Sequence, residues 1–232
     1  MIARAIWTAF LAGLFAGSCL FLVQRSLTLP LIRQAQTFER VASEQSAADP
    51  LASEPMRSLS TLLGDAFVGI GFGLILTGAY ARSGKEGWLA GLGFGAAGFA
   101  VFQAAPAMIV PPATPGMELA PLLLRQVAWL TAAISAIVGL VLICKAKGAA
   151  KFAGIMIVAL PSIVFRTLLP IAPAETSSRE LAALDRVFIL RTLASMLMFW
   201  LILGITTGYL FGKRRGTSRS SSRWTDSGAS RD

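Results

Sequence analysis

Apolar residues along this chain gather into six long runs separated by polar segments. The runs are residues 5–23, 62–80, 88–110, 122–144, 152–171 and 187–211. A helix needs about 20 consecutive apolar residues to cross the hydrocarbon core of a bilayer. The pattern predicts an all-α fold, a polytopic transmembrane helix bundle of six spans in a membrane domain over residues 1–215.

The fifth run is the weakest of the six. It contains Pro161, Arg166 and Pro170, and its uncharged part, residues 152–165, is short for a span. A five-span interpretation, in which this segment is re-entrant, therefore stays open.

Two polar segments complete the predicted organisation. Residues 25–61 form an extracytoplasmic loop, and its first half is expected to be a short surface helix because Leu27, Leu31 and Phe38 recur at near-helical spacing. Residues 216–232 are rich in serine, glycine and arginine, which predicts a disordered cytoplasmic tail.

The charge distribution agrees with six spans and with both termini in the cytoplasm. Of the 232 residues, 55% are hydrophobic and 14% are charged, with a net charge of +9. In the six-span topology this whole excess falls on the cytoplasmic side, which is the positive-inside pattern. The topology of a membrane protein thus explains the excess of basic residues, so we expect lipid and no nucleic acid as a partner.

The chain contains no histidine. This excludes the Ser-His-Asp and Cys-His nucleophile arrangements and every imidazole metal site. Because Asp65 is the one carboxylate within a span and has no second acid beside it, we expect no enzyme activity and no cofactor.

Pairs of glycines four residues apart recur in three of the runs. They are Gly13/Gly17, Gly69/Gly73 and Gly91/Gly95. Small residues at this spacing allow two helix backbones to approach closely in a membrane. They predict close helix packing.

Five polar residues are the candidate site. Asp65 lies inside the second run, where a carboxylate is costly unless it serves as a cation ligand or proton relay or pairs with an arginine such as Arg25 or Arg191. Gln103 ends the third run, Glu118 lies in the proline-rich turn that follows, and Arg125 and Gln126 begin the fourth run.

A set of short motifs resembles the CbtA family of proposed cobalt transporter subunits over nearly the whole chain. The most specific series is Ala104-Ala-Pro106, Pro111-Pro112, Pro115-Gly116, and Arg125-Gln126 before Trp129. Further matches are Leu22-Val-Gln24, Pro30-Leu-Ile32, Phe38-Glu39, Gly139-Leu140, Leu160-Pro161 and the stretch 199–204.

The resemblance implies a bacterial inner-membrane protein that supplies cobalt for cobalamin synthesis. It also implies a small one-span partner subunit that bears histidines. In a transporter of this kind we expect Asp65, Gln103 and Glu118 to be metal ligands, with Arg125 and Gln126 supporting them. The family is usually described with five spans. Its members tend to carry histidine at the positions of Gln103 and Ser162, so the metal chemistry does not carry over with the fold.

Two other functions remain open from the sequence. The lack of histidine is compatible with a membrane scaffold or assembly subunit that no longer binds metal. Four arginines at outer helix ends, Arg25, Arg125, Arg166 and Arg191, are compatible with a transporter of an anionic or neutral solute.

Overall fold

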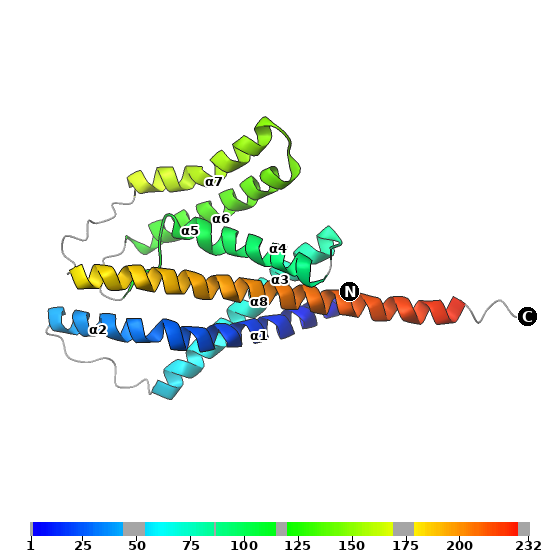
Figure 1. Cartoon of the computed structure of the whole chain (residues 1–232), viewed down its shortest axis with the longest axis horizontal. Coiled ribbons are helices and arrows are strands. Elements are labelled where there is room, and N and C mark those ends of the chain that lie inside the picture. Colours follow the sequence, from blue (N-terminus) through cyan, green and yellow to red (C-terminus); the bar gives the residue numbers. More distant parts are fainter. Residues whose placement is uncertain (1, 44–53, 86, 115–119, 169–178, 227–232) are drawn as a thin grey trace, which may run out of the picture. The chain divides into compact units, whose positions relative to one another are not determined.

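The computed structural model describes residues 2–43, 54–85, 87–114, 120–168 and 179–226, and within these ranges it contains helices and no strand. Figure 1 shows their order along the chain. The helices are α1 (Ile2–Leu27), α2 (Leu29–Ser43), α3 (Glu54–Ser83), α4 (Trp88–Phe99), the π-helix η1 (Ala100–Ala104), α5 (Ala105–Ala107), α6 (Leu122–Lys145), α7 (Ala149–Leu168) and α8 (Arg179–Asp226).

Six helical segments of the described chain are long and apolar enough to cross a membrane. This confirms the predicted all-α class and the six-span interpretation of the apolar runs. The weak fifth run forms α7, which continues through Pro161 as one helix. The six segments are Ala5–Leu27, Pro55–Ser83, Trp88–Ala107, Leu122–Lys145, Ala149–Thr167 and Ala182–Gly212.

Both polar segments contain helix in the structure. The first contains α2, which is the short helix that the apolar spacing predicted. In the second, α8 extends to Asp226, and the disorder expected from Gly216 stays a prediction. Once a helix has formed, each further residue that becomes ordered adds one hydrogen bond. A helix that begins in an apolar segment can therefore continue into a polar one.

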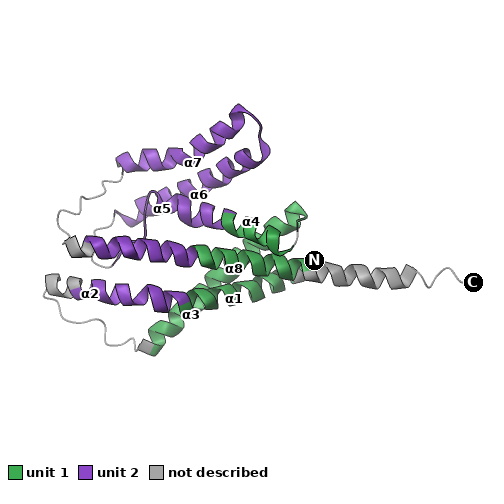
Figure 2. Cartoon of the chain, in the orientation of Figure 1, with its two compact units in different colours: residues 1–22, 51–96, 197–232 green, residues 23–50, 97–196 purple. Residues whose placement is uncertain are grey.

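The chain divides into two compact units, coloured separately in Figure 2. Unit 1 comprises residues 1–22, 51–96 and 197–232, and unit 2 comprises residues 23–50 and 97–196. The boundaries fall inside α1 and α8 and at the end of α4. Each unit is therefore assembled from segments that are far apart in the sequence.

Unit 1 is held together by glycines at which helix backbones meet. Gly13 of α1 lies against Gly69 of α3, and a Cβ atom at Gly73 would fall 2.8 Å from the carbonyl oxygen of Ala9. On the other side, a Cβ atom at Gly91 of α4 would fall 2.6 Å from the carbonyl oxygen of Gly204 in α8. The glycine pairs in the sequence thus mark real helix contacts, as predicted.

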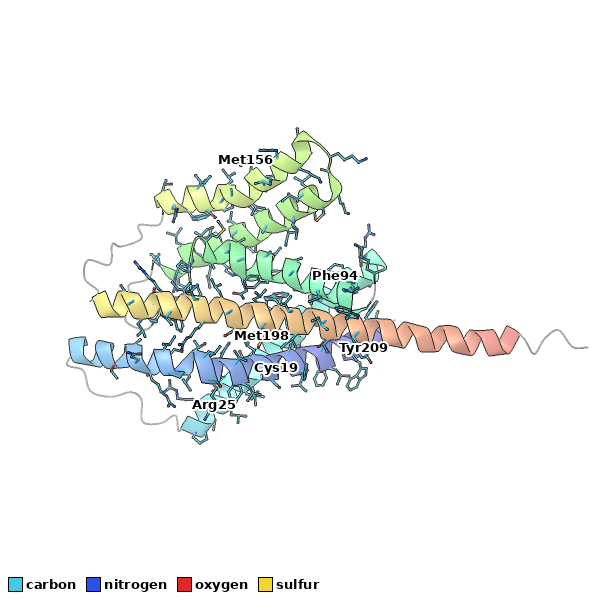
Figure 3. The ribbon with its side chains drawn as sticks, in the orientation of Figure 1. Cys19, Arg25, Phe94, Met156, Met198 and Tyr209 are labelled. Atoms are coloured by element: carbon cyan, nitrogen blue, oxygen red, sulfur yellow. The ribbon has the colours of Figure 1, made fainter. Side chains whose placement is uncertain are left out.

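A buried tyrosine joins α3 to α8 in the same unit. The hydroxyl of Tyr80 donates to the carbonyl oxygen of Gly204 at 3.0 Å, and the residue has no exposed surface. Its ring packs on Phe94 and Phe211, with ring centroids 4.7 and 5.8 Å away. Phe94 and Tyr209, on neighbouring helices of this unit, are labelled in Figure 3.

Unit 2 contains the α6–α7 hairpin, which turns at Gly148 with φ of 57°. The hairpin helices meet at Gly139 and Gly154, where a Cβ atom at Gly154 would fall 2.8 Å from the Gly139 carbonyl oxygen. The outer face of α7 is apolar and exposed, as at Met156 (Figure 3). This is the surface expected of a helix that faces lipid.

Candidate functional site

The third span contains a break in its helical hydrogen-bond pattern. Residues Ala100–Ala104 form a π-helical turn, in which the amide of Ala105 donates to the carbonyl of Ala100. Pro106 follows at once, with no N–H and with a ring that would collide with the carbonyl four residues earlier. Single π turns inside α-helices occur often at functional positions.

Gln103 lies within this turn and is half-buried. Val101 of the turn and Ala105 just after it pack on α6, where they share a buried cluster with Ala133 and Ala136. The ring of Phe102 stacks on Trp129 of α6 with centroids 6.3 Å apart. Residues on both sides of Gln103 therefore pack against α6.

Arg125 occupies the first turn of α6, in the same unit as Gln103. Its side chain is half-buried, and its Nε atom is buried with no hydrogen-bond partner among the described residues. A buried donor of a charged group left without an acceptor is costly, so it marks a place where an acceptor is expected. The adjacent Gln126 is exposed.

The proline-rich segment after the third span is tied to α8. Asp185 accepts two hydrogen bonds on its Oδ1 atom, from the amide of Thr114 at 3.0 Å and from its hydroxyl at 3.1 Å. Thr114 is buried. A carboxylate that accepts two such bonds is a strong anchor, so Asp185 of α8 holds the chain in place at Thr114.

The junction of α1 and α2, also in unit 2, is closed by an arginine. Leu31 donates its amide to Thr28, which leaves the carbonyl of Leu27 without its usual helical donor. The Nη1 atom of Arg191 in α8 donates to this carbonyl at 3.1 Å. Arg191 therefore completes the C-terminal end of α1.

Asp65 is in unit 1, on α3. Its backbone lies against Gly17 of α1, so the residue is placed at a close crossing of two helices. The side chain is half-buried, and its Oδ2 atom is buried with no hydrogen-bond partner in the described chain. An acceptor placed this way can receive a cation or a proton.

The structure therefore groups the predicted residues only in part. Gln103, Arg125 and Gln126 belong to unit 2 and Asp65 to unit 1, while Glu118 lies outside the described residues. Among the described residues, no three His, Cys, Asp or Glu side chains gather where they could hold a metal ion. The two described candidate ligands, Asp65 and Gln103, are oxygen donors that belong to different units.

Sequence reasoning missed three features of the site. These are the π-helical turn, the Asp185–Thr114 anchor and the Arg191 contact. Pro106 inside an apolar run was a signal for the first, because proline disrupts helical hydrogen bonding. The partners of Asp185 and Arg191 are 71 and 164 residues away in sequence, and no local pattern identifies such pairs.

Comparison with known proteins gives one match that covers nearly the whole chain. A family described as a probable cobalt transporter subunit (CbtA) matches residues 2–212. No curated protein and no solved structure gives a significant match.

Proposed function

The chain belongs to the CbtA family of probable cobalt transporter subunits, and from this premise we propose that it moves cobalt across the bacterial inner membrane for cobalamin synthesis. The observation that carries the proposal is the family match over residues 2–212, which spans all six candidate membrane helices. The excess of basic residues at the termini and the short inner loops favours cytoplasmic termini.

The proposed ligands for cobalt are Asp65, Gln103 and Glu118, with Arg125 and Gln126 in support. All three ligands offer oxygen, which binds Co²⁺ less tightly than imidazole does. Weak binding is compatible with transport, since an ion that crosses a membrane must also leave each site. Asp65 carries most of this proposal because its buried Oδ2 atom has no other partner in the described chain.

A partner subunit would supply the ligands that this chain lacks. A transporter subunit works with other subunits, and the chain has no histidine of its own. We propose a small one-span partner bearing histidines, which would capture the metal before it passes to the oxygen ligands. In this arrangement the chain has no catalytic role.

Cobalt accumulation in cells tests the function. Cells expressing the chain with its partner should accumulate Co²⁺ above cells with an empty vector, measured by elemental analysis. Asp65→Asn, which keeps the shape of the side chain and removes its charge, should reduce accumulation at least tenfold. Asp185→Asn is the matched control, because that carboxylate is already occupied by Thr114.

Other outcomes identify the alternatives. Unchanged accumulation in Asp65→Asn would remove Asp65 from the ligand set. No accumulation with the folded protein and its partner would contradict cobalt transport. Solute uptake that survives metal chelation and is lost in Arg125→Ala would support an anionic solute, for which the buried Nε atom offers a donor.

A further inference from the structure

The apolar contact between α2 and the start of α8 ends at two threonines, Thr28 and Thr192. Both belong to unit 2 (Figure 2). The apolar part of the contact is one buried cluster, formed by Leu31, Ala35, Leu184 and Phe188. Thr28 precedes the two α2 members of the cluster by three and seven residues, and Thr192 follows the two α8 members by four and eight. Residues at these spacings share one face of a helix, so both threonines lie on the faces that meet.

The neighbouring residues place the two threonines at the same level. Arg191, just before Thr192, donates to the carbonyl of Leu27, just before Thr28, at 3.1 Å. The residue numbers rise along α2 as they fall along α8, so the two segments run antiparallel. The last pair of residues on the facing sides is therefore Thr28 and Thr192.

The hydroxyl groups of both threonines lack partners. Thr28 is only 7% exposed, and the Oγ1 atoms of Thr28 and Thr192 are buried without a hydrogen-bond partner in the described chain. A buried hydroxyl without a partner is costly and marks a place where a polar atom is expected.

The local backbone does not compensate for this cost. A threonine that precedes a helix usually accepts from the amide two or three positions ahead. For Thr28 the first of these is Pro30, which has no amide hydrogen, and the second, Leu31, donates to the carbonyl of Thr28 instead. Ser195 donates to the Arg191 carbonyl at 2.7 Å, but Thr192 makes no such bond to its own helix.

The threonine pair lies where lipid headgroups are expected. The first candidate span, Ala5–Leu27, ends directly before Thr28. The last, Ala182–Gly212, has 31 residues, whereas about 20 cross the hydrocarbon core. Counted back from Gly212, about 20 residues end next to Thr192. Both helices therefore place this junction at the boundary between hydrocarbon and headgroups.

The charges at the junction favour an anion. Residues 23–43 and 179–196 carry six arginines against three carboxylates, and one of those carboxylates, Asp185, already accepts from Thr114. Arg191 is exposed, and its five N–H donors exceed the single bond to Leu27. Hydroxyl groups beside a guanidinium act as donors to an anionic oxygen, and arginine binds phosphate through paired N–H groups.

We propose that Arg191, Thr28 and Thr192 bind one phosphate group at the headgroup level of the membrane. One phosphate oxygen accepts from the two hydroxyls, and the others face the exposed guanidinium. The bound phosphate joins the α1–α2 junction to α8. The site is defined by these three side chains and does not depend on cobalt transport.

Thermal unfolding in a maltoside detergent, which contains no phosphate, tests the site on the full chain. The protein is heated alone or with one of four additions at equal ionic strength. These are phosphatidylglycerol, dioleoylglycerol (a lipid without phosphate), sodium phosphate and sodium chloride. At a hundredfold excess over Kd, phosphatidylglycerol should raise Tm by about 5 °C or more, and dioleoylglycerol should leave it unchanged.

The four additions also identify the source of the phosphate. A shift with phosphatidylglycerol alone assigns a lipid headgroup, and a shift with sodium phosphate assigns the free ion, and either supports the site. Equal shifts with the two lipids would reveal a general effect of lipid chains and overturn the proposal. A shift with chloride as large as that with phosphate, or no shift with either phosphate source, would overturn it too.

Valine variants locate the effect. Thr28→Val and Thr192→Val keep the shape of the side chain and remove the hydroxyl, and each should reduce the Tm shift by at least half. Without any addition, each should unfold at the same temperature as the unmodified chain or higher, because the unpaired hydroxyl is gone. A lower Tm without addition would show that the hydroxyls already have partners, which contradicts the proposal.

Thr207→Val is the matched control. Its hydroxyl is equally buried and without a partner in the described chain, but it lies farther along α8 in unit 1. This variant should keep the full shift, and an equal response of all three variants would exclude the junction as the site. Should a junction variant not fold, Arg191→Lys replaces it. Lysine keeps the charge and a donor for Leu27 but lacks the paired N–H groups, so the shift should again fall by half, and a full shift would refute the site.

Discussion

Replacement of Gly95 by alanine is the sharpest test of how unit 1 is packed. In the structure, a Cβ atom at this position would lie 2.5 Å from the carbonyl oxygen of Trp200 and 3.2 Å from the Cα atom of Leu201. A comfortable carbon–oxygen contact is about 3.3 Å or longer. The α4 and α8 backbones would have to separate by most of an ångström.

The magnitude follows from two opposing effects. Alanine favours the helix by up to about 1 kcal/mol over glycine. Overpacking at a tight contact costs about 1–3 kcal/mol, and the backbone atoms at this crossing leave no flexible side chain that could move aside. We therefore expect Gly95→Ala to lower the free energy of unfolding by about 0–2 kcal/mol net.

The matched control is Gly93→Ala on the same helix. A Cβ atom at Gly93 has nothing within 4 Å, so this variant should be as stable as the unmodified protein or slightly more stable. Unfolding by a denaturing detergent, followed through tryptophan fluorescence, measures both, since Trp200 lies at the contact. Equal stability of the two variants would refute the close approach of α4 and α8.

Two further predictions concern single hydrogen bonds. Tyr80→Phe removes the hydrogen bond to the Gly204 carbonyl and keeps the ring contacts, so it should lower the free energy of unfolding by about 1 kcal/mol in the same assay. A decrease below about 0.3 kcal/mol, which is on the order of the error of such assays, would contradict the hydrogen bond. Asp185→Ala removes both bonds to Thr114 and should cost about 1.5–3 kcal/mol, whereas Thr114→Val removes only the hydroxyl bond and should cost about 1 kcal/mol. Equal costs for these two variants would show that the amide of Thr114 does not depend on Asp185.

The spans could be predicted from the sequence because their signal is local. A run of about 20 apolar residues meets the bilayer requirement whatever its neighbours are. The glycine pairs likewise predicted close packing, which the structure confirms at Gly13 and Gly91. The identity of each partner, such as Gly204 for Gly91, could not be predicted, since a small residue does not specify which helix it will face.

The candidate site was harder to predict because it also depends on which distant residues meet in the fold. Gln103 and Arg125 stood out as polar residues at the ends of apolar runs. The π turn that carries Gln103 depends on which amides reach which carbonyls, and a hydropathy pattern contains no such information. Asp185 lies near the start of a mostly apolar helix and gave no sign of its bonds to Thr114, because the two residues meet only when the chain has folded.

The composition of unit 1 has a consequence for biogenesis. Its third segment, residues 197–232, is synthesised after the other two segments of the unit. Until then, Gly91 and Gly95 of α4 lack the helix that covers them, so an inserted but incomplete chain exposes a close-packing surface to lipid and to other membrane proteins. A chain interrupted before residue 197 therefore keeps this glycine face of α4 without its partner helix.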